Sequence, residues 1–438
     1  MIRRALIVTS SYAPTMIADM QRARQLAWEL PETGWQVEIL CPDSSYQHAS
    51  CIDHDSAGFF SPDTLIHYVP QYFPWLSRFL RLGSIGWRAL FPMLVAGKRL
   101  LGQREFDVVF ISTTQFPLFL LGPAWQKWLG TPYILDFHDP CYRENSVTPM
   151  WARPSLRHAV SHWLAKKIES ISVPAAAGLV AVSPDYIQAL RRRYENRKPN
   201  WLGAGRNAVI AFTVLPRDFA EAARKEIAPA QLESGRQIRI VYAGAGGEVM
   251  HRSFLLLCNV LAYLKVQDPR AVDRIQFELY GTMLGWHDGD PRHLTEIAFE
   301  QGIADLVNED PRRVSYGRSV ELLLEGDGIF ILGVDDAGYM PSKLFSYAAA
   351  GKPMLAVLRR DGPAFAQFQN LPELGHAIWF GESGAMPVID AAREVGDFLR
   401  ECVAGKKFDR RALLKPYTAL CMARRHAELF EACVNTNA

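Results

Sequence analysis

The sequence has few features that would tie it to a disulfide framework, a structural metal or a nucleic acid. Its seven cysteines are odd in number, scattered along the chain, and never spaced as C-x-x-C. This pattern fits a reducing cytosol and no structural zinc site. The formal net charge of +2 is too small to argue for binding to nucleic acid. We therefore expect no nucleic-acid partner.

The chain also lacks a recognisable export or membrane-spanning segment. Its start, MIRRALIVTSSYAP, passes from two arginines directly to a β-type run, without a long apolar core before a cleavage site. The longest run free of charged residues, 108–126, is long enough to span a bilayer but contains Pro117 and Gly122-Pro123. We expect a buried strand, a loop and a helix there, in a chain that stays in the cytoplasm.

The composition and length indicate more than one globular core. Hydrophobic residues make up 49% and charged residues 21% of the sequence, which is a globular composition. A chain of 438 residues is too long for one ordinary core. Strand-like apolar runs, mostly separated by helix-like segments, occur in two series. The first series is 6–9, 35–40, 65–69, 106–112, 132–137 and 177–183; the second is 238–244, 275–281, 312–316, 327–333 and 353–358.

Alternating strands and helices of this kind predict an α/β fold made of two Rossmann-like, doubly wound parallel-sheet domains facing a cleft. The turn-rich segment NRKPNWLGAGRN and the helix-like stretch after it indicate a linker. We place the first domain at 1–216 and the second at 217–405. The amphipathic pattern of 406–438, interrupted by Pro416, predicts a helical segment that packs back on the first domain.

In the second domain, YMPSKLFSYAAAGKP at 339–353 has the pattern of a helix entered through a turn. Ser342 can cap the helix, and Lys343, Ser346 and Tyr347 share one face because of their spacing. A helix start with an added cation suits a phosphate group. The alternative is an ordinary capped helix with a solvated lysine.

A glycine-rich turn, AGAGGEVMHR at 243–252, directly follows a predicted strand and precedes a helix. The backbone at Gly246 and Gly247 could approach a diphosphate closely, and Arg252 could add a bidentate contact. Such turns are common, so the turn alone is weak evidence. Together with the helix entry at Lys343, it predicts a diphosphate site at the strand ends of this domain.

The motifs occur in an order that resembles the GT-B glycosyltransferases, specifically the large retaining group called family 4. The resemblance covers almost the whole chain and is carried by ALIVTSSYAPTMIADMQRARQLAWELPETGWQVEILCP, PYILDFHDP, AGLVAVSP, IRIVYAGAGG and YMPSKLFSYAAAGKPMLAV. It implies a nucleotide-sugar donor held by the second domain, an acceptor held by the first, and no metal or other cofactor. The family's pair of glutamates is replaced here by Gly338 and Ser346. Asp335 or Asp336 could substitute for the first.

In the first domain, LDFHDP places Asp136, His138 and Asp139 at the end of a predicted strand. The resemblance implies that this edge faces the reaction, and we assign His138 and Asp139 as catalytic groups that accept the acceptor's proton or stabilise charge. Asp136 is assigned to acceptor binding. The alternative is that an aspartate caps a turn and that His138 is an ordinary satisfied histidine.

Two further residues near the first strand are assigned to the acceptor. Arg22 matches a basic residue often found on the first helix of the family, and Tyr12 lies in the loop before that helix. Arg22 could equally be a helix-surface arginine.

The segment GWHDGDPRH at 285–293 resembles a metal cluster, but its glycines and proline favour a surface loop, and we expect no metal.

Two stretches of the first domain lack acidic residues and interleave basic with aromatic ones, within 67–104 and 151–167. Such a mixture suits an anionic membrane surface. Alternatively, the aromatic residues fill the core and the basic ones are solvated.

Our leading interpretation is a cytoplasmic glycosyltransferase, peripheral at the inner face of the membrane, that adds a sugar to a lipid-linked glycan in polysaccharide or O-antigen assembly. The rivals are a catalytically inactive GT-B scaffold and a nucleotide-sugar epimerase of the same fold.

Overall fold

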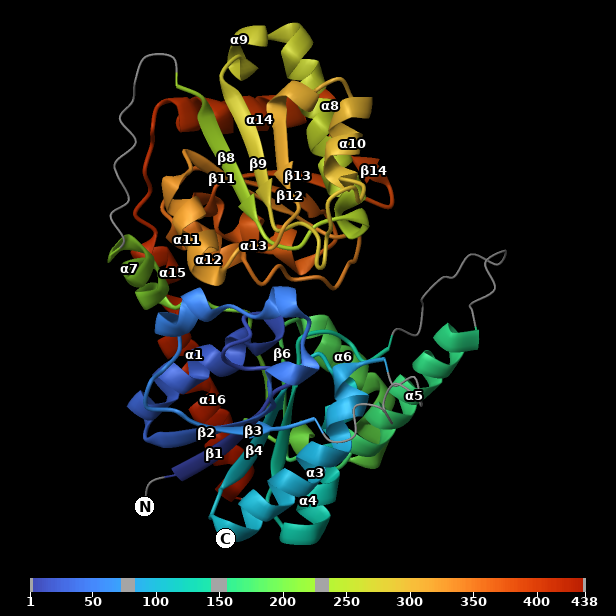
Figure 1. Cartoon of the computed structure of the whole chain (residues 1–438). Helices are drawn as coiled ribbons and strands as arrows, with labels where there is room; N and C mark the ends of the chain where they lie inside the picture. Colours follow the sequence, from blue (N-terminus) through green and yellow to red (C-terminus); the bar gives the residue numbers. More distant parts are fainter. Residues whose placement is uncertain (1–2, 72–82, 143–155, 225–235, 436–438) are drawn as a thin grey trace. The chain divides into compact units, whose positions relative to one another are not determined.

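The computed structural model describes residues 3–71, 83–142, 156–224 and 236–435 (Figure 1). The chain forms two compact units. The first unit comprises Met1–Ala211 together with Ala419–Ala438, and the second comprises Phe212–Thr418. The division thus lies a few residues before the expected boundary at 216, and the chain returns to the first unit at Ala419 instead of at residue 406.

The first unit contains a seven-stranded sheet in the order β3-β2-β1-β4-β5-β6-β7. Every pairing between its neighbouring strands is parallel. The strands are β1 (Arg3–Val8), β2 (Trp35–Pro42), β3 (Leu65–Val69), β4 (Val108–Ser112), β5 (Tyr133–Phe137), β6 (Gly178–Ala181) and β7 (Asn207–Val209). The central strands β4 and β5 are buried throughout, as their continuous apolar runs predict.

Helices cover the first sheet on both faces, as expected of a doubly wound fold. They are α1 (Gln21–Glu29), α3 (Ile85–Gln103), α4 (Leu121–Leu129), α5 (Leu156–Ser172), α6 (Pro184–Tyr194) and α16 (Ala419–Val434). Helix α3 lies against α4, which lies against α5, and α16 packs on α1 (Figure 1). Gly97 allows the close approach of α3 to α4, since a Cβ there would lie 2.1 Å from the ring of Trp125.

The second unit repeats the plan with a sheet in the order β10-β9-β8-β11-β12-β13-β14. Its pairings are parallel except that β14 is antiparallel to β13. The strands are β8 (Ile238–Ala243), β9 (Ile275–Tyr280), β10 (Val307–Asp310), β11 (Gly328–Leu332), β12 (Met354–Arg359), β13 (His376–Gly381) and β14 (Gly384–Ala385). The prediction of an α/β fold with two doubly wound sheets is confirmed.

One predicted strand is wrong. The segment 312–316 is not a strand. The strand in this part of the chain is β10, which ends at Asp310. The side chain of Ser315 accepts a hydrogen bond from the backbone N–H of Arg318 and so starts helix α11 (Tyr316–Glu325). Strands β7, β13 and β14 were not predicted.

The helices of the second unit lie on both sides of its sheet (Figure 1). Besides α11, they are α7 (Pro216–Arg224), α8 (His251–Gln267), α9 (Pro269–Val272), α10 (His293–Glu300), α12 (Leu344–Ala349), α13 (Pro363–Asn370), α14 (Val388–Val403) and α15 (Arg411–Leu414). Within the described ranges one segment, Glu248–Gln267, is long and apolar enough to cross a membrane. Helix α8 within it packs on α14 and α10, so its apolar residues serve this core.

Residues 406–418 belong to the second unit, which corrects the expected start of the returning segment. The Arg410 guanidinium donates to the carbonyl oxygen of Glu373 over 2.9 Å and to that of Lys352 over 2.8 Å. The backbone N–H of Phe408 donates to the carbonyl oxygen of Gly351 over 2.8 Å. These bonds hold the segment on the second unit until α16 begins at Ala419.

Candidate active site

A buried ionic group lies at the carboxyl end of the first sheet, where β5 and the loop after it place Asp136 and His138. The Asp136 carboxylate is fully buried, and its Oδ2 accepts bonds from Ser112 Oγ and His138 Nε2, each over 2.7 Å. Arg22 Nε lies 2.9 Å from the same oxygen. Burial alone would raise the pKa of Asp136, but Arg22 and His138 outweigh it and hold the pKa well below its ordinary value.

A second buried carboxylate, Asp19, faces the other side of the imidazole and was not predicted. Its oxygens accept bonds from the hydroxyl of Ser10, the hydroxyl of Thr113 and the backbone N–H of Thr114. Asp19 Oδ1 lies 3.9 Å from His138 Nδ1. One weak signal could have pointed to Asp19, namely that it follows the loop after the first strand.

The structure places the two predicted acceptor residues Arg22 and Tyr12 in the core beneath this group. Arg22 is 1% exposed and donates to the carbonyl oxygen of Ile210 over 2.7 Å. Burial lowers the pKa of Arg22. Tyr12 is also 1% exposed, and its ring meets that of Phe60 at 5.2 Å between centroids. Arg22 therefore acts on Asp136, and neither side chain lies on a surface where an acceptor could touch it.

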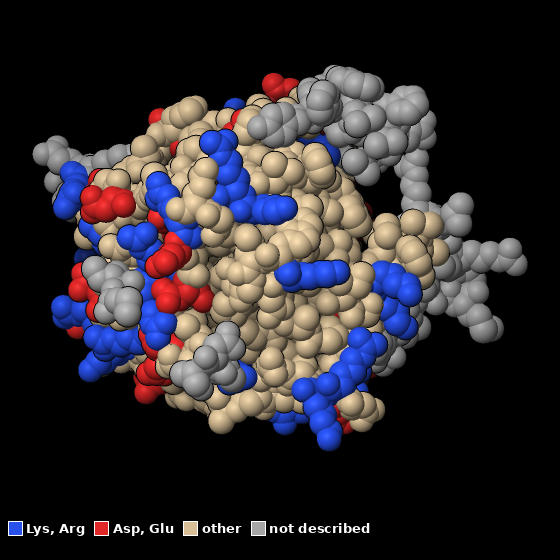
Figure 2. Space-filling view, turned by 90° about the horizontal axis from the view of Figure 1, so that it is seen from below, with Lys and Arg blue, Asp and Glu red and all other residues tan. Residues whose placement is uncertain are grey.

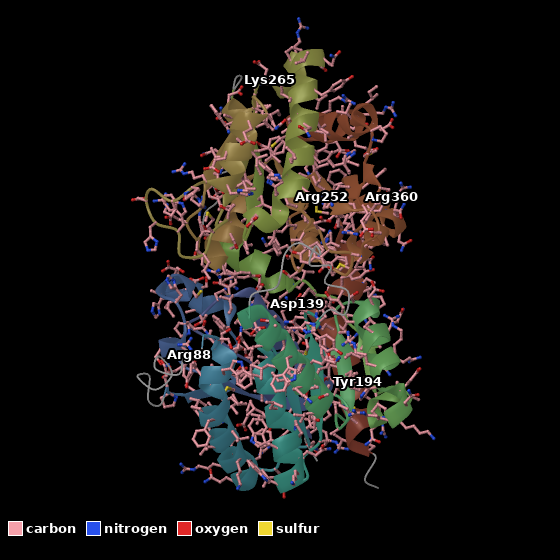
Figure 3. All side chains as sticks on the ribbon, turned by 90° about the vertical axis from the view of Figure 1, so that its right-hand side faces the viewer. Arg88, Asp139, Tyr194, Arg252, Lys265 and Arg360 are labelled. Atoms are coloured by element: carbon pink, nitrogen blue, oxygen red, sulfur yellow. The ribbon has the colours of Figure 1, made fainter. Side chains whose placement is uncertain are left out.

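Asp139, the other predicted catalytic residue, has a different environment from His138. It lies one residue further along the loop and is exposed (Figure 3), whereas His138 is 5% exposed. The structure thus separates the two predicted groups. His138 is held by buried partners, whereas Asp139 is exposed to solvent.

In the second unit, the predicted glycine-rich turn connects β8 to the short helix before α8. Gly244 has φ of 140°, and a Cβ at this position would lie 1.8 Å from Nζ of Lys343. The backbone N–H of Gly246 donates to the carbonyl oxygen of Thr282 over 2.9 Å, and Gly247 has φ of 85°. The glycine that the site requires most clearly is therefore Gly244, which the sequence motif contained but did not distinguish.

Lys343 reaches back over the end of β8. Its Nζ donates to the hydroxyl of Tyr242 over 3.2 Å and lies 4.4 Å from the centroid of that ring. Burial, followed by the nearby Arg313 cation, lowers the pKa of Lys343 to about 7. Within the described part of the chain, no carboxylate forms a salt bridge with this ammonium group. Lys343 is thus a part-buried cation beside a glycine turn, which suits an anionic ligand.

The other predicted residues of this segment have structural partners. Helix α12 begins at Leu344 with Lys343 at the cap position and no capping side chain, so the prediction that Ser342 caps it is wrong. Ser346 Oγ donates to the carbonyl oxygen of Lys343 over 3.0 Å. The Tyr347 hydroxyl donates to the carbonyl oxygen of Ala243 over 2.7 Å and accepts from its N–H over 2.8 Å. Tyr347 therefore fixes the end of β8.

Arg252, predicted as a phosphate contact, is engaged by the protein. Its Nη1 donates to Asp335 Oδ2 over 2.7 Å, and its Nη2 donates to the carbonyl oxygen of Gly381 over 2.8 Å. Arg359 Nη1 lies 2.8 Å from the other oxygen of Asp335. The acid considered as a substitute for the family's first glutamate is thus paired with two arginines.

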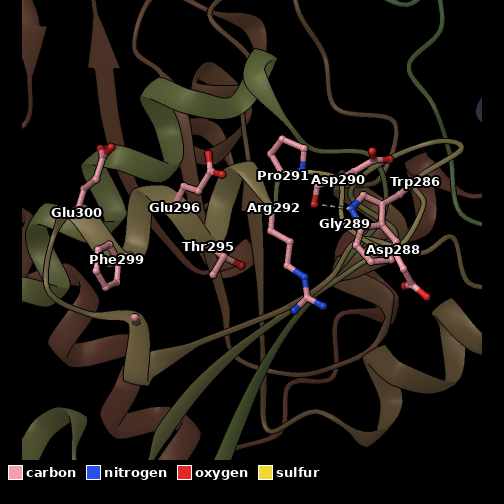
Figure 4. A pocket seen from close by; sticks show the side chains of 11 residues that line it. Trp286, Asp288, Gly289, Asp290, Pro291, Arg292, Thr295, Glu296, Phe299 and Glu300 are labelled. Atoms are coloured by element: carbon pink, nitrogen blue, oxygen red, sulfur yellow. Dashed lines mark hydrogen bonds between the residues drawn. The ribbon is translucent and has the colours of Figure 1, made fainter.

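The loop that resembled a metal cluster lines an open pocket of ≈ 860 Å³ together with α10. Trp286, Arg292, Glu296 and Phe299 contribute side chains to it (Figure 4). The Arg292 guanidinium lies 5.6 Å from the centroid of the Trp286 ring. Among the residues that the structure describes, no three histidine, cysteine or acidic side chains converge as metal ligands.

Comparison with known proteins gives a family match for part of the chain. Residues 20–201 match the family described as "Glycosyl transferase 4-like domain". No curated protein matches the sequence. The match covers most of the first unit, including β5 and the loop after it, which carry Asp136 and His138.

Solved structures match almost the whole chain. A glycosyltransferase from Rickettsia africae matches with a TM-score of 0.59 and 12% identity, covering 99% of both chains. Anabaena HepE in complex with UDP-glucose matches with a TM-score of 0.58 and 11% identity, covering 98% of this chain and 99% of that one. A UDP-N-acetylglucosamine 2-epimerase from Listeria monocytogenes, described as putative, has a TM-score of 0.54 and 10% identity, covering 98% and 96%. At these identities the likeness establishes the fold, which is GT-B.

Proposed function

We propose a substrate pair for this chain, which is a glycosyltransferase with a glycosyl transferase 4-like domain and the GT-B fold. The donor is a nucleotide sugar, and the acceptor is a lipid-linked glycan or a related molecule, as in the assembly of polysaccharide or O-antigen. The observation that carries the proposal is Lys343, a part-buried ammonium group that reaches over Gly244 at the strand ends of the second unit.

The donor assignment rests on charge. Gly244 leaves room for Lys343, and Arg313 adds a second cation nearby. A diphosphate supplies negative charge beside Lys343, which forms no salt bridge with a carboxylate of the described residues, and charge-assisted hydrogen bonds to it are strong. The Anabaena relative was crystallised with UDP-glucose, which favours a uridine nucleotide as the first donor to test. We propose that Lys343 also stabilises the departing diphosphate, without a resident metal.

The acceptor step is assigned to the first unit. His138 Nε2–H donates to Asp136, so Nδ1 is the nitrogen that can take a proton from the acceptor hydroxyl. The acceptor oxygen then bonds to the anomeric carbon of the donor sugar, while the bond from that carbon to the diphosphate breaks. We propose that Asp139, which is exposed, binds the acceptor or shares this role.

Thermal shift against a nucleotide panel tests the donor site. We expect one base among UDP, GDP, CDP, ADP and dTDP, and its sugar, to raise the melting temperature, because a ligand that binds only the native state stabilises it. Gly244→Ala should abolish this rise, since its Cβ displaces Lys343. Gly302→Ala is the matched control, because Gly302 also has positive φ (71°) but has open space around it.

If no nucleotide raises the melting temperature of the folded wild-type chain, the donor assignment is contradicted. It would favour the inactive scaffold, for which Gly338 and Ser346 already argue, because they replace the family's two glutamates and Ser346 bonds to its own helix. If one nucleotide still raises the melting temperature of Gly244→Ala, the chain binds a nucleotide donor, but Lys343 is not part of the donor site.

The membrane part of the proposal rests on α3, α4 and α5. Phe91, Trp128 and Trp163 are 71%, 46% and 56% exposed on these helices. Lys98 Nζ lies 4.7 Å from the centroid of the Trp128 ring, and Lys167 Nζ lies 5.8 Å from that of Trp163. Exposed aromatic rings next to ammonium groups suit the headgroup region of an anionic bilayer.

The basic segments 67–104 and 151–167 support the proposed membrane surface only through the residues that the structure describes. Residues 72–82 and 143–155, which include Arg78, Arg81 and Trp151, lie outside the described residues. Figure 2 shows one end of the molecule, where acidic side chains gather mainly on the left and basic ones predominate on the right. A membrane surface on one side would bring a lipid-linked acceptor within reach.

Flotation with phosphatidylglycerol vesicles tests the membrane surface. We expect the wild-type chain to float with the vesicles at low salt and to remain at the bottom at high salt, because screening weakens attraction to anionic lipid. The double variant Phe91→Ser and Trp128→Ser should lose flotation at low salt as well. Phe299→Ser is the matched control, since Phe299 is 75% exposed on the second unit. Absence of flotation by the wild-type chain at low salt would refute the proposal.

A further inference from the structure

His138 lies between two buried carboxylates from different parts of the chain. On one side Nε2 lies 2.7 Å from Asp136 Oδ2, and on the other Nδ1 lies 3.9 Å from Asp19 Oδ1. Asp19 is 7% exposed, and it comes from the short helix Ala18–Met20 that precedes α1. Nothing in the role proposed for His138 requires this second carboxylate.

The position of the Asp19 carboxylate is fixed by the sheet itself. Ser10 follows β1, whereas Thr113 and Thr114 follow β4, and all three donate to Asp19. A carboxylate held by hydrogen bonds from two strand ends has little freedom to move. Its negative charge is therefore presented to the Nδ1 side of His138 at a set distance.

We infer that Asp19 is a positioning residue for the glycosyl transfer: it orients the His138 ring and stabilises the positive charge that the ring acquires. The inference rests on the proposed role of His138. In the step, the acceptor oxygen bonds to the anomeric carbon, and the bond from that carbon to the diphosphate breaks. The electron pair leaves with the nucleoside diphosphate, and the hydroxyl proton passes to Nδ1.

The charge arrangement explains why two carboxylates are useful. Arg22 already balances Asp136, so a proton that arrives on His138 needs a second negative partner. Asp19 supplies it on the side where the proton arrives, and a buried pair interacts more strongly than one in water. The acceptor hydroxyl has to touch only His138.

The test compares Asp19→Asn with Asp107→Asn in the full chain. Asp107 also links β1 to β4, since it accepts from the Arg4 N–H over 2.7 Å and from Arg3 Nη1 over 2.8 Å, but it does so at the amino ends of these strands. The assay measures release of nucleoside diphosphate from the nucleotide sugar that stabilises the wild-type chain, with a membrane extract as acceptor.

For Asp19→Asn we expect kcat to fall by roughly 10- to 100-fold, since acid–base groups contribute on this order. The donor KM should stay within about twofold, because donor binding belongs to the second unit. Asp107→Asn should leave kcat and KM as in the wild type.

A second variant and a spectroscopic measurement keep the inference testable if Asp19→Asn folds poorly. Thr113→Val removes one donor to Asp19 and should give a smaller fall in kcat than Asp19→Asn. The ¹⁵N signals of His138, assigned with His138→Gln, should shift in Asp19→Asn and not in Asp107→Asn.

Three outcomes would overturn the inference. An unchanged kcat in folded Asp19→Asn, or equal losses in both aspartate variants, would reduce Asp19 to a structural role. Unchanged ¹⁵N signals of His138 would do the same without any activity assay. No turnover by the wild-type chain on a donor that binds would instead contradict the proposed function itself.

Discussion

Replacing Arg22 with methionine should lower the melting temperature of the first unit by several degrees, although no ligand or surface is touched. The guanidinium lies 2.9 Å from the fully buried carboxylate of Asp136. Removing one partner of a buried pair leaves an uncompensated charge, which costs about 3–5 kcal/mol. His138 and Ser112 still donate to Asp136, so we expect about 3 kcal/mol, or roughly 6–12 °C for a domain of this size.

The measurement is differential scanning calorimetry of the full chain, in which the transition of the first unit is followed. Arg312→Met is the control, because Arg312 pairs with Asp310 on the surface and its removal should leave the transition in place. The double variant Arg22→Met and Asp136→Leu should recover much of the loss, since it buries no unpaired charge. An Arg22→Met transition equal to that of the wild type would show that Asp136 does not depend on Arg22.

Acid should reduce this difference between variant and wild type. The pKa of Asp136 is held well below its ordinary value in the folded chain, so its stabilising contribution is present above about pH 4 and is lost as the pH falls further. His426, whose pKa is lowered to about 3 by burial and then by the charge of Arg22, adds a separate loss below about pH 6.5, which should be smaller in Arg22→Met than in the wild type. The comparison is therefore made between the two proteins at each pH.

Most of the fold could be predicted because its parallel strands are continuous apolar runs, such as 238–244, which became β8. The failure at 312–316 has a physical cause. The true strand β10 has the sequence VNED, whose acids conceal it from a search for apolar runs. Glu309 is buried in this strand only because Thr282 and Thr295 donate to it. Such compensation depends on residues that are distant in the sequence.

The candidate site shows the same limit. Asp136 and His138 could be predicted because they end or directly follow a strand, where ligands bind in open sheets, and Lys343 because it stands at a predicted helix start. The partners of Arg22 and Arg252 could not, since a lone arginine in a sequence does not reveal whether it meets a ligand or a carboxylate such as Asp335. Local motifs thus locate the site, and tertiary contacts decide which of its charges are available.

The affinity for UDP-glucose should fall as the pH rises above 7, by about tenfold for each pH unit until the neutral lysine sets a floor. Burial and Arg313 lower the pKa of Lys343 to about 7, so the free site loses its ammonium charge near neutral pH. A bound diphosphate favours the charged form and draws a proton onto Lys343. UDP-glucose suits the test because its diphosphate is a diester whose charge is constant over this range. If the panel selects another base, its nucleotide sugar replaces UDP-glucose.

Isothermal titration at pH 8 in buffers of different ionisation enthalpy should therefore detect uptake of about 0.4 to 0.85 of a proton on binding. The ligand-free chain should respond with the opposite sign. Because the unfolded lysine keeps its ordinary pKa near 10.4, the unfolded state binds more protons between pH 7 and 10, and the folded state gains stability as the pH rises. A general unfolding at alkaline pH would lower both the affinity for UDP-glucose and the stability of the ligand-free chain. An affinity that falls while the stability rises with pH therefore identifies Lys343.

Lys343→Met should remove the pH dependence and weaken binding at pH 6.5 by roughly 10- to 150-fold, the equivalent of one charge-assisted hydrogen bond. Lys265→Met is the matched control, since Lys265 pairs with Asp305 over 2.6 Å elsewhere on the second unit (Figure 3) and should change neither quantity. Binding of UDP-glucose that is independent of pH in the wild type, with no proton uptake, would show that the diphosphate does not contact Lys343. The glycine turn would then hold its ligand through backbone groups alone.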